Sequence, residues 1–566
     1  MTKHSPILEV SHLHISFPKG DERIQVVRDL SFKVERGRTL AIVGESGSGK
    51  TISSLASMGL LPKGIARIDQ GSIRYSGLEE GLEHLDESAW CGLRGKHIAM
   101  IFQNPMSSLN PSLRVGDQVF EMLEQHQQEE NPSARKKKVL QLFEEVKLPS
   151  PESTYRKYPH ELSGGQKQRI MIAMALACDP DVIIADEPTT ALDVSVQKSI
   201  LSLLRHLLKE RNAGMIFISH DLDVVSEIAD DVLVMYRGEA MEYGLAEEVL
   251  LRPKTAYTKG LIACKPPLSN LPERLPTVED FIAAEKSGEA VVFHPQKKGT
   301  HHHLLLEVKG LRKTYPTSKT LLGKVKSSFT AVDSIDFSIF RGETLGLVGE
   351  SGCGKSTVSR LIMGLLEADA GEVNYEGKNL LSASKAEWKV LRRKFQLIFQ
   401  DPFSALNPRK TVGQCLDEVM AYHHLHGNRQ ERKLHALKLL RQVGLDESAW
   451  DKYPHAFSGG QRQRIVIARA LAVEPEFIIC DESVSALDVS VQAQVLNLLN
   501  DLKDQYGLTF LFISHDLSVV HYMSDRICVM EKGEIVELGN ANQVFHHPQD
   551  PYTKRLIASI PKQVLH

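Results

Sequence analysis

Two glycine-rich segments have the spacing of a phosphate-binding loop. They are Gly44-Glu45-Ser46-Gly47-Ser48-Gly49-Lys50-Thr51 and Gly349-Glu350-Ser351-Gly352-Cys353-Gly354-Lys355-Ser356. The glycines let backbone N–H groups curl around phosphates, and the N-terminus of a following helix adds its dipole. Each lysine is expected to reach the β- and γ-phosphates, and the hydroxyl of Thr51 or Ser356 is expected to bind Mg²⁺. The two loops therefore predict two nucleotide sites.

Each phosphate loop has a matching pair of adjacent carboxylates further along the chain. The pairs are Asp186-Glu187 and Asp481-Glu482, and each follows a short apolar run. A buried strand that ends in two carboxylates delivers them to the ligand-binding edge of a parallel sheet. The aspartate can hold the Mg²⁺ shell, while the glutamate can polarise the water that attacks the γ-phosphate. This pattern predicts hydrolysis as well as binding.

A histidine follows a second apolar run in each copy. His220 lies 33 residues after Glu187 (220 − 187), and His515 lies 33 residues after Glu482 (515 − 482). A single histidine in such a place is usually structural, but the repeated spacing favours a functional role. It can hydrogen-bond a γ-phosphate and so distinguish ATP from ADP.

A second glycine-rich element opens a long helical pattern in each copy. The two elements are Ser163-Gly164-Gly165-Gln166 and Ser458-Gly459-Gly460-Gln461, before predicted helices at Gln166–Ala177 and Gln461–Ala472. A glycine-rich turn at a helix N-terminus is an anion site. Each copy thus has two anion sites and only one nucleotide cradle, which suggests that the second element serves the neighbouring copy.

The elements that must position these groups are short strands alternating with helices. Strands are predicted at Thr39–Val43, Val182–Ala185, Met215–Ser219, Thr344–Val348, Phe477–Cys480 and Phe510–Ser514, and a helix at residues 52–60. Buried apolar runs of this length that alternate with helical patterns predict an α/β fold with a parallel sheet.

The motifs recur as a long internal repeat. The phosphate loops are 305 residues apart (349 − 44), and the later motifs are 295 apart (481 − 186). This period is too long for a solenoid and indicates two homologous domains. We predict domains at residues 7–265 and 304–562, joined by a proline-rich linker at 266–303 that has little core of its own.

Composition narrows the class of protein. The chain has 566 residues, 42% of them hydrophobic, and a formal net charge of −3, which excludes a chain-wide basic surface for nucleic acid. No run approaches the ~18 apolar residues of a membrane helix, and no apolar signal core follows Met1. The seven cysteines include no CxxC pair. We expect a cytoplasmic chain with reduced thiols and no membrane span.

These motifs together resemble the ATP-binding-cassette (ABC) ATPases over nearly the whole chain. The resemblance implies two P-loop NTPase domains, each with a RecA-like core, an antiparallel β subdomain and a helical subdomain. It also implies an intramolecular cassette dimer, in which the Ser-Gly-Gly-Gln signature of one cassette contacts ATP held by the other. ATP and Mg²⁺ are the implied substrate and cofactor.

The resemblance extends the site to residues that the spacing alone does not reveal. Gln103 and Gln400 match the Q-loop glutamine, which senses Mg²⁺ and touches the membrane partner. Asp193 and Asp488 match the D-loop aspartate. An aromatic about 30 residues before each phosphate loop stacks on adenine in this family; Phe17 and Tyr315 fit that position.

Further motifs are similar to those of the oligopeptide, dipeptide and nickel importer ATPases. They are Phe102–Pro111 and Phe399–Pro408, Tyr158-Pro159-His160 and Tyr453-Pro454-His455, and Pro551-Tyr552-Thr553 with its blurred copy Ala256-Tyr257-Thr258. Fused pairs of this type resemble the glutathione and microcin C importer ATPases. The implied partners are two transmembrane permeases and, through them, a substrate-binding protein, at the cytoplasmic face of the inner membrane.

Three departures from the family pattern matter. Only Cys264 lies near the place of the cysteine cluster found in many single-cassette relatives, so we expect no iron–sulfur cluster. Ser483-Val484 replaces the usual Pro-Thr, yet both glutamates and both histidines remain, so two hydrolytic sites are predicted. Cys353 lies inside the second phosphate loop, where a helix N-terminus can lower a thiol pKa. An alkylating agent is therefore expected to block that site, with protection by ATP.

Two other classes of protein share the same chemistry. A soluble tandem cassette acting on the ribosome also lacks membrane spans, but the proline-rich linker and the short basic runs disfavour it. An exporter ATPase would use the same residues with a different permease. The Q-loop and Tyr-Pro-His motifs favour import, although the chemistry of the site alone does not decide the direction or the substrate.

Overall fold

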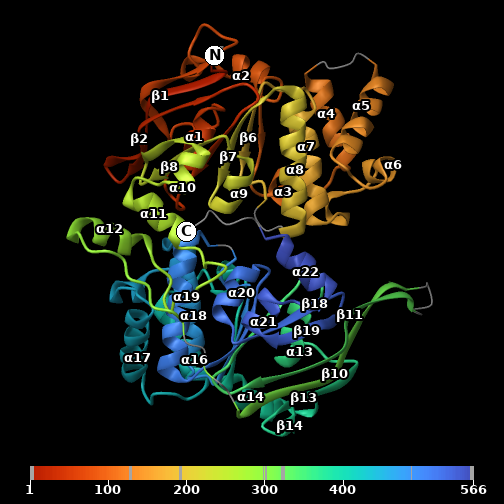
Figure 1. The fold of residues 1–566 in the computed structure, drawn as a ribbon, viewed down its shortest axis with the longest axis vertical. Helices are drawn as coiled ribbons and strands as arrows, with labels where there is room; N and C mark the ends of the chain where they lie inside the picture. The colour runs from red at the N-terminus through yellow and green to blue at the C-terminus, as the bar shows by residue number, and fades with distance from the viewer. Residues whose placement is uncertain are drawn as a thin grey trace. The chain divides into compact units, whose positions relative to one another are not determined.

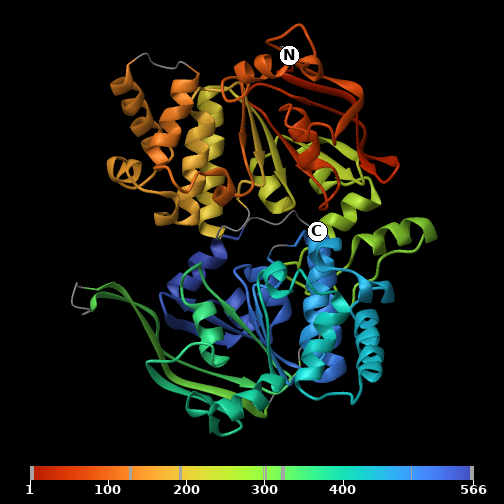
Figure 2. The same cartoon turned by 180° about the vertical axis from the view of Figure 1, so that it is seen from behind.

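The computed structural model describes residues 6–126, 131–189, 194–296, 299, 302–319, 325–485 and 487–560. The chain forms two compact units. The first holds residues 6–263 and Thr277–Val291, and the second holds Cys264–Pro276 and Val292–Ile560. Within each unit, Figures 1 and 2 show a central sheet with a helical subdomain on one side and an antiparallel sheet on the other.

The central sheet of the first unit has six strands in the order β5-β6-β7-β3-β8-β9. Their bounds are β3 Thr39–Val43, β5 Ile98–Ile101, β6 Val182–Asp186, β7 Gly214–Ser219, β8 Asp231–Tyr236 and β9 Glu239–Leu245. Neighbours are parallel except β8 and β9. All residues of β3, β6 and β7 are buried, as expected for parallel strands covered on both faces.

The second unit repeats this sheet in the order β15-β16-β17-β12-β18-β19. Its strands are β12 Thr344–Val348, β15 Phe395–Ile398, β16 Phe477–Asp481, β17 Thr509–Ile513, β18 Arg526–Glu531 and β19 Glu534–Asn540. In both units the strand before the phosphate loop (β3 or β12) lies next to the strand before the histidine (β7 or β17). The strand before the acidic pair (β6 or β16) follows, and then the strand before the Q-loop (β5 or β15).

An antiparallel sheet accompanies each central sheet. In the first unit it is β2-β1-β4, with β1 Leu8–Lys19, β2 Glu22–Val34 and β4 Arg67–Tyr75. In the second it is β11-β10-β13-β14, with β10 Leu304–Lys319, β11 Val325–Phe340, β13 Ala370–Tyr375 and β14 Lys378–Asn379. Apolar side chains of both sheets of a unit share one hydrophobic core.

Helices complete both units. Those of the first are α1 Lys50–Ala56, α2 Glu87–Leu93, α3 Pro105–Ser108, α4 Val115–Gln125, α5 Pro132–Glu145, α6 Pro151–Tyr155, α7 Gly164–Leu176, α8 Val194–Arg211, α9 Leu222–Ile228, α10 Ala246–Leu251, α11 Ala256–Ala263 and α12 Val278–Ser287. Those of the second are α13 Lys355–Ile362, α14 Lys385–Lys394, α15 Pro402–Ala405, α16 Val412–Tyr422, α17 Arg429–Gln442, α18 Gly459–Leu471, α19 Val489–Tyr506, α20 Leu517–Met523, α21 Ala541–His546 and α22 Pro551–Ala558. In the described part of the chain, no helix could span a bilayer.

The α/β fold class predicted from the sequence is confirmed, with small shifts at element ends. The helix predicted at residues 52–60 begins at Lys50 and ends at Ala56, because the loop glycine Gly49 serves as its N-cap. The helices predicted from Gln166 and Gln461 begin two residues earlier, at Gly164 and Gly459. The signature glycines thus belong to the first helical turn.

The segment between the cassettes is largely ordered where the structure describes it. Helix α12 packs on α11 in the first unit. In the second unit, Asn497 of α19 accepts a hydrogen bond from the N–H of Leu275 (2.9 Å) and donates one to its carbonyl (2.8 Å). The Tyr522 hydroxyl donates to the carbonyl of Glu273 at 3.2 Å. Pro272 pairs with Pro295, and Gln296 Nε2 donates to the carbonyl of Tyr522 at 3.2 Å. Residues 271–275 and 294–296, which we call the strap, therefore pack on the second unit.

Candidate nucleotide-binding sites

The first phosphate loop curls around its own lysine. Lys50 Nζ donates hydrogen bonds to the carbonyl oxygens of Gly44 (2.7 Å) and Glu45 (2.8 Å). Gly44 has φ +147°, and a Cβ there would lie 2.1 Å from the carbonyl oxygen of Met235, so only glycine fits. The loop therefore presents backbone N–H groups and a buried ammonium at the N-terminus of α1, which is the arrangement that binds phosphates.

The second loop has the same geometry. Lys355 Nζ donates to the carbonyl oxygens of Gly349 (2.7 Å) and Glu350 (2.9 Å). Cys353 takes the place that Ser48 has in the first loop, and its Sγ lies 3.7 Å from Lys355 Nζ. The Cys353 side chain is buried, so the thiol faces the interior of the loop.

The predicted Mg²⁺ groups meet at the C-terminal edge of each central sheet. The Thr51 hydroxyl donates to Asp186 Oδ1 at 3.3 Å, and the Ser356 hydroxyl donates to Asp481 Oδ1 at 3.2 Å. A hydroxyl and a carboxylate beside a phosphate cradle are the hard oxygen ligands that Mg²⁺ takes in such sites, so the residues fit this ion. When bound, Mg²⁺ neutralises charge on the phosphate oxygens.

Burial raises the pKa of both aspartates. The pKa of Asp186 is raised to about 6, first by burial and then by the charge of Glu187, against the opposing effects of Thr51 and Lys50. The pKa of Asp481 is also raised, again chiefly by burial. An ionised carboxylate is unfavourable here until a cation arrives, which is expected of a metal ligand in an apolar setting.

Each predicted catalytic glutamate lies beside the Q-loop glutamine and the histidine of its own unit. Gln103 Nε2 donates to Glu187 Oε2 at 2.8 Å, and His220 Nδ1 lies 3.3 Å from Glu187 Oε1. In the second unit, Gln400 Nε2 donates to Glu482 Oε2 at 2.6 Å. The structure therefore brings the Q-loop, acidic pair and histidine of each unit together at one sheet edge.

His515 completes the second group. Its Nδ1 lies 3.7 Å from Glu482 Oε1, and the interaction with His515 holds the pKa of Glu482 below its ordinary value despite burial. Glu482 is therefore ionised at neutral pH, as a group that polarises water must be.

Both glutamates have a left-handed backbone. Glu187 has φ +46° and Glu482 has φ +49°, and their N–H groups donate to the carbonyls of Ile218 (3.0 Å) and Ile513 (2.9 Å) on the neighbouring strand. This conformation costs about 1–2 kcal/mol for a residue other than glycine. Such strain is concentrated at functional sites. Here it turns the chain sharply at the end of the strand.

Each signature serine caps its own helix. Ser163 Oγ accepts from the N–H of Gln166 at 3.3 Å, and Gln166 Oε1 accepts from the N–H of Ser163 at 3.1 Å. Ser458 and Gln461 repeat this capping box at 3.4 and 3.2 Å. The capping box fixes the glycine turn at the start of α7 and α18. The contact of each signature with ATP in the other cassette stays a prediction.

The four remaining predicted residues are the two D-loop aspartates and the two aromatic residues. Asp488 immediately precedes α19, as a D-loop residue would, whereas Asp193 lies outside the described residues. Phe17 in β1 and Tyr315 in β10 are both half-buried in the antiparallel sheets. Their stacking on adenine stays a prediction.

Sequence reasoning missed two tyrosines that contact the phosphate loops. The hydroxyl of Tyr257 accepts a hydrogen bond from the N–H of Glu45 (3.1 Å), and that of Tyr552 accepts one from the N–H of Glu350 (3.0 Å). The available signal was the Tyr-Thr pair that is repeated after each cassette, which is part of the resemblance to the oligopeptide and dipeptide importer ATPases.

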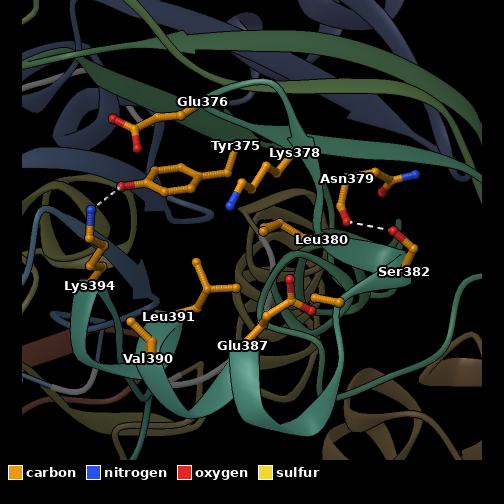
Figure 3. A pocket seen from close by; sticks show the side chains of 11 residues that line it. Tyr375, Glu376, Lys378, Asn379, Leu380, Ser382, Glu387, Val390, Leu391 and Lys394 are labelled. Carbon is orange, nitrogen blue, oxygen red and sulfur yellow. Dashed lines mark hydrogen bonds between the residues drawn. The ribbon is translucent and has the colours of Figure 1, made fainter.

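Two cavities lie away from the phosphate loops. One, of about 550 Å³, lies in the second unit between β13 and α14. Figure 3 shows Tyr375, Leu391 and Lys394 on its wall. The other, of about 430 Å³, is a mostly apolar groove beside the first Q-loop and includes Phe102, Met171 and Met174. None of the predicted nucleotide-binding residues lines either one.

The fold and the two sites define a tandem P-loop ATPase, and comparison with known proteins places it more closely. Residues 27–190 and 332–485 match the family described as ABC transporter. Residues 241–286 and 536–564 match the oligopeptide/dipeptide transporter C-terminal region. The chain belongs to the ABC transporter family and is a transport ATPase with two cassettes.

Curated relatives match nearly the full length. The glutathione import ATP-binding protein GsiA of Pectobacterium atrosepticum is 43% identical over 99% of this chain and 90% of that protein. The protein of that name from Escherichia coli O157:H7 is 45% identical over 98% and 89%. Among solved structures, a dimeric bacterial ABC transporter cassette is 28% identical, with a TM-score of 0.38 over 42% of this chain and 99% of that one.

Proposed function

We propose that this chain is the ATP-hydrolysing motor of an importer for peptide-sized substrates, working through two separate membrane permeases and their substrate-binding protein. The observation that carries the proposal is the pairing of two complete ATPase groups with two copies of the oligopeptide/dipeptide transporter C-terminal region. The relatives named for glutathione import, 43–45% identical over nearly the whole chain, support import and a short peptide as substrate. In this proposal the chain lies peripherally at the cytoplasmic face of the inner membrane.

In the proposed cycle the two ATPase sites act together as one conformational switch. ATP binds to the phosphate loops, and the two cassettes close with each signature against the nucleotide of the other. Glu187 and Glu482 direct water at the γ-phosphates, while His220 and His515 sense whether a γ-phosphate is present. Loss of phosphate reopens the pair, as in other switches biased by a γ-phosphate.

Permeases are proposed to dock beside the Q-loops. In the first unit, the groove there is lined by Met171, Met174 and Phe102, and the Phe102 side chain is 42% exposed. Methionine-lined grooves adapt to apolar helices of varied shape. In the second unit, Phe399 and Phe403 are exposed at the matching Q-loop (46% and 62%). Because Gln103 and Gln400 bond the glutamates, a permease that moves a Q-loop also moves a catalytic group.

Uptake in cells tests this proposal. Cells that depend on this chain are given labelled glutathione, a labelled dipeptide or nickel ions, with the unmodified chain or with Glu187→Gln and Glu482→Gln combined. We expect uptake of a peptide-sized substrate to be lost only with the double variant. If the two strains take up glutathione, the dipeptide and nickel ions equally well, the importer role is contradicted.

A groove variant separates docking from hydrolysis. Met174→Arg places a positive charge in the apolar groove of the first cassette. We expect it to weaken permease binding while the ATPase activity of the purified chain is retained. Unchanged permease binding contradicts docking in this groove.

A further inference from the structure

Two tyrosines from the C-terminal region of each cassette reach back to the phosphate loops. Tyr257 lies at the start of α11 and Tyr552 at the start of α22. Their hydroxyls accept hydrogen bonds from the N–H of Glu45 (3.1 Å) and of Glu350 (3.0 Å), the second residue of each loop. The same contact therefore recurs in both cassettes.

Both tyrosines are rigidly placed. Tyr257 is 2% exposed and Tyr552 is 6% exposed. The Tyr257 ring lies 4.3 Å from that of Tyr236, centroid to centroid. Burial raises the pKa of Tyr552 to about 12, so its phenol stays neutral at physiological pH. A buried aromatic ring with a single polar atom is well suited to hold one backbone group in place.

The edge strand of each central sheet holds the turn that presents the tyrosine. In the first unit, Glu242 of β9 accepts hydrogen bonds from the N–H groups of Lys254 (3.0 Å) and Thr255 (3.3 Å). In the second, Glu537 of β19 accepts them from the N–H groups of Gln549 (2.9 Å) and Asp550 (3.1 Å). The two glutamates occupy equivalent positions (537 − 242 = 295). Both the tyrosine and its support are therefore duplicated.

The bonded N–H belongs to the residue whose carbonyl binds the lysine. Glu45 donates its N–H to Tyr257 and accepts from Lys50 Nζ through its oxygen at 2.8 Å. Glu350 does the same with Tyr552 and Lys355, whose Nζ lies 2.9 Å away. The tyrosine therefore fixes the backbone that places the phosphate-binding ammonium. Without the hydroxyl, this hydrogen bond is lost and the loop becomes less ordered before ATP arrives.

These tyrosines lie outside the stretches that match the general cassette family. Those stretches end at residues 190 and 485, whereas Tyr257 and Tyr552 fall within the matched oligopeptide/dipeptide C-terminal regions. We propose that Tyr257 and Tyr552 are positioning residues that pre-organise the phosphate loops for ATP, so that the C-terminal region of each cassette sets its affinity for nucleotide. The inference rests on the ATPase activity and not on the proposed import substrate.

Removal of one oxygen atom tests the proposal. Tyr257→Phe and Tyr552→Phe keep the ring and delete the hydroxyl. We expect each to raise the Kd for ATP at its own site three- to tenfold, while kcat at saturating ATP changes less than twofold because the hydrolytic groups are untouched. Photolabelling with 8-azido-ATP, followed by proteolysis between the cassettes, assigns the effect to a site.

Tyr375→Phe is the matched control. Tyr375 is 4% exposed, and its hydroxyl donates to Glu476 at 2.9 Å in the same cassette as Tyr552. The control deletes an equally buried phenolic hydroxyl away from the phosphate loop. The Kd of this control for ATP should stay within twofold of that of the unmodified chain, even if its melting temperature changes.

Three outcomes overturn the inference. A lower melting temperature with unchanged Kd means that the hydroxyl only anchors the helix. A lower kcat with unchanged affinity places its effect on hydrolysis. An equal rise in Kd for Tyr375→Phe shows that any buried hydroxyl has this effect. The proposal is supported if each variant raises the Kd for ATP only at the site whose loop its tyrosine contacts, while kcat stays constant.

Discussion

The buried carboxylate of Asp186 is expected to make the nucleotide-free first cassette less stable as pH rises. Asp186 is only 5% exposed, and burial together with the charge of Glu187 raises its pKa from 3.8 to about 6. A raised pKa means that the folded chain binds this proton more tightly than the unfolded chain does. The stabilisation is therefore present in full below pH 4 and is lost as pH rises through about 6.

The size of the effect follows from the shift. A difference of about 2 pKa units is worth about 3 kcal/mol in total. Of this, about 2 kcal/mol falls between pH 4.5 and pH 8, since part of the change is already complete at pH 4.5. Asp186→Asn has no proton to lose and gains no charge, so its stability relative to the unmodified chain should increase by that amount over this range.

Tryptophan fluorescence during urea unfolding measures this difference for one cassette. The chain has three tryptophans, and only Trp90 lies in the first cassette. Replacing Trp388 and Trp450 by phenylalanine leaves Trp90 as a reporter of the first unit. Unfolding is followed without nucleotide or Mg²⁺ at pH 4.5, 6 and 8, with Asp186 or with Asp186→Asn.

A difference between the two proteins that is the same at all three pH values would refute the reasoning. It would mean that Asp186 titrates alike in the folded and unfolded chains, so that the site imposes no cost on its charge. Addition of Mg²⁺ and ATP at pH 8 should reverse the order of stability, because the bound ion compensates the ionised Asp186.

Three further predictions concern hydrolysis, the thiol and the strap. Glu187→Gln and Glu482→Gln should each slow single-turnover hydrolysis at their own site at least 100-fold; a rate that one substitution leaves unchanged contradicts two active sites. N-Ethylmaleimide should react with Cys353 slowly, inactivate the second site and be slowed by ATP, while Ser48→Cys should transfer this sensitivity to the first site. Full labelling of Cys353 without loss of activity contradicts this. Asn497→Ala should raise hydrogen exchange at residues 271–275 about tenfold, because it removes both bonds to that backbone; unchanged exchange contradicts docking of the strap.

The local elements of the site could be predicted because their signals are short and dense. The strand at Thr39–Val43 and the one at Thr344–Val348 match the structure at both ends, since each is a buried apolar run that stops at a loop glycine. Repetition also helped. It favoured a functional role for His220 and His515 over a structural one, a role that stays a prediction, and it indicated two cassettes, as the two matches to the family confirm.

What the sequence could not show are contacts between segments far apart in the chain. The strand order that sets Lys50, Asp186 and His220 at one edge depends on packing of the whole unit. The bond from Gln103 to Glu187 spans 84 residues, and that from Glu45 to Tyr257 spans 212. No local pattern encodes such pairs. The proline-rich composition of the linker likewise gave no sign that Asn497 would bind it.

Affinity purification from detergent-solubilised native membranes tests most directly whether this chain drives a membrane importer. The tagged full chain is captured in the presence of ATP and Mg²⁺, and its partners are identified by mass. We predict two polytopic membrane proteins in equal amounts, together with a substrate-binding protein. Capture of ribosomal proteins with no membrane partner would contradict the importer role while leaving both ATP sites intact.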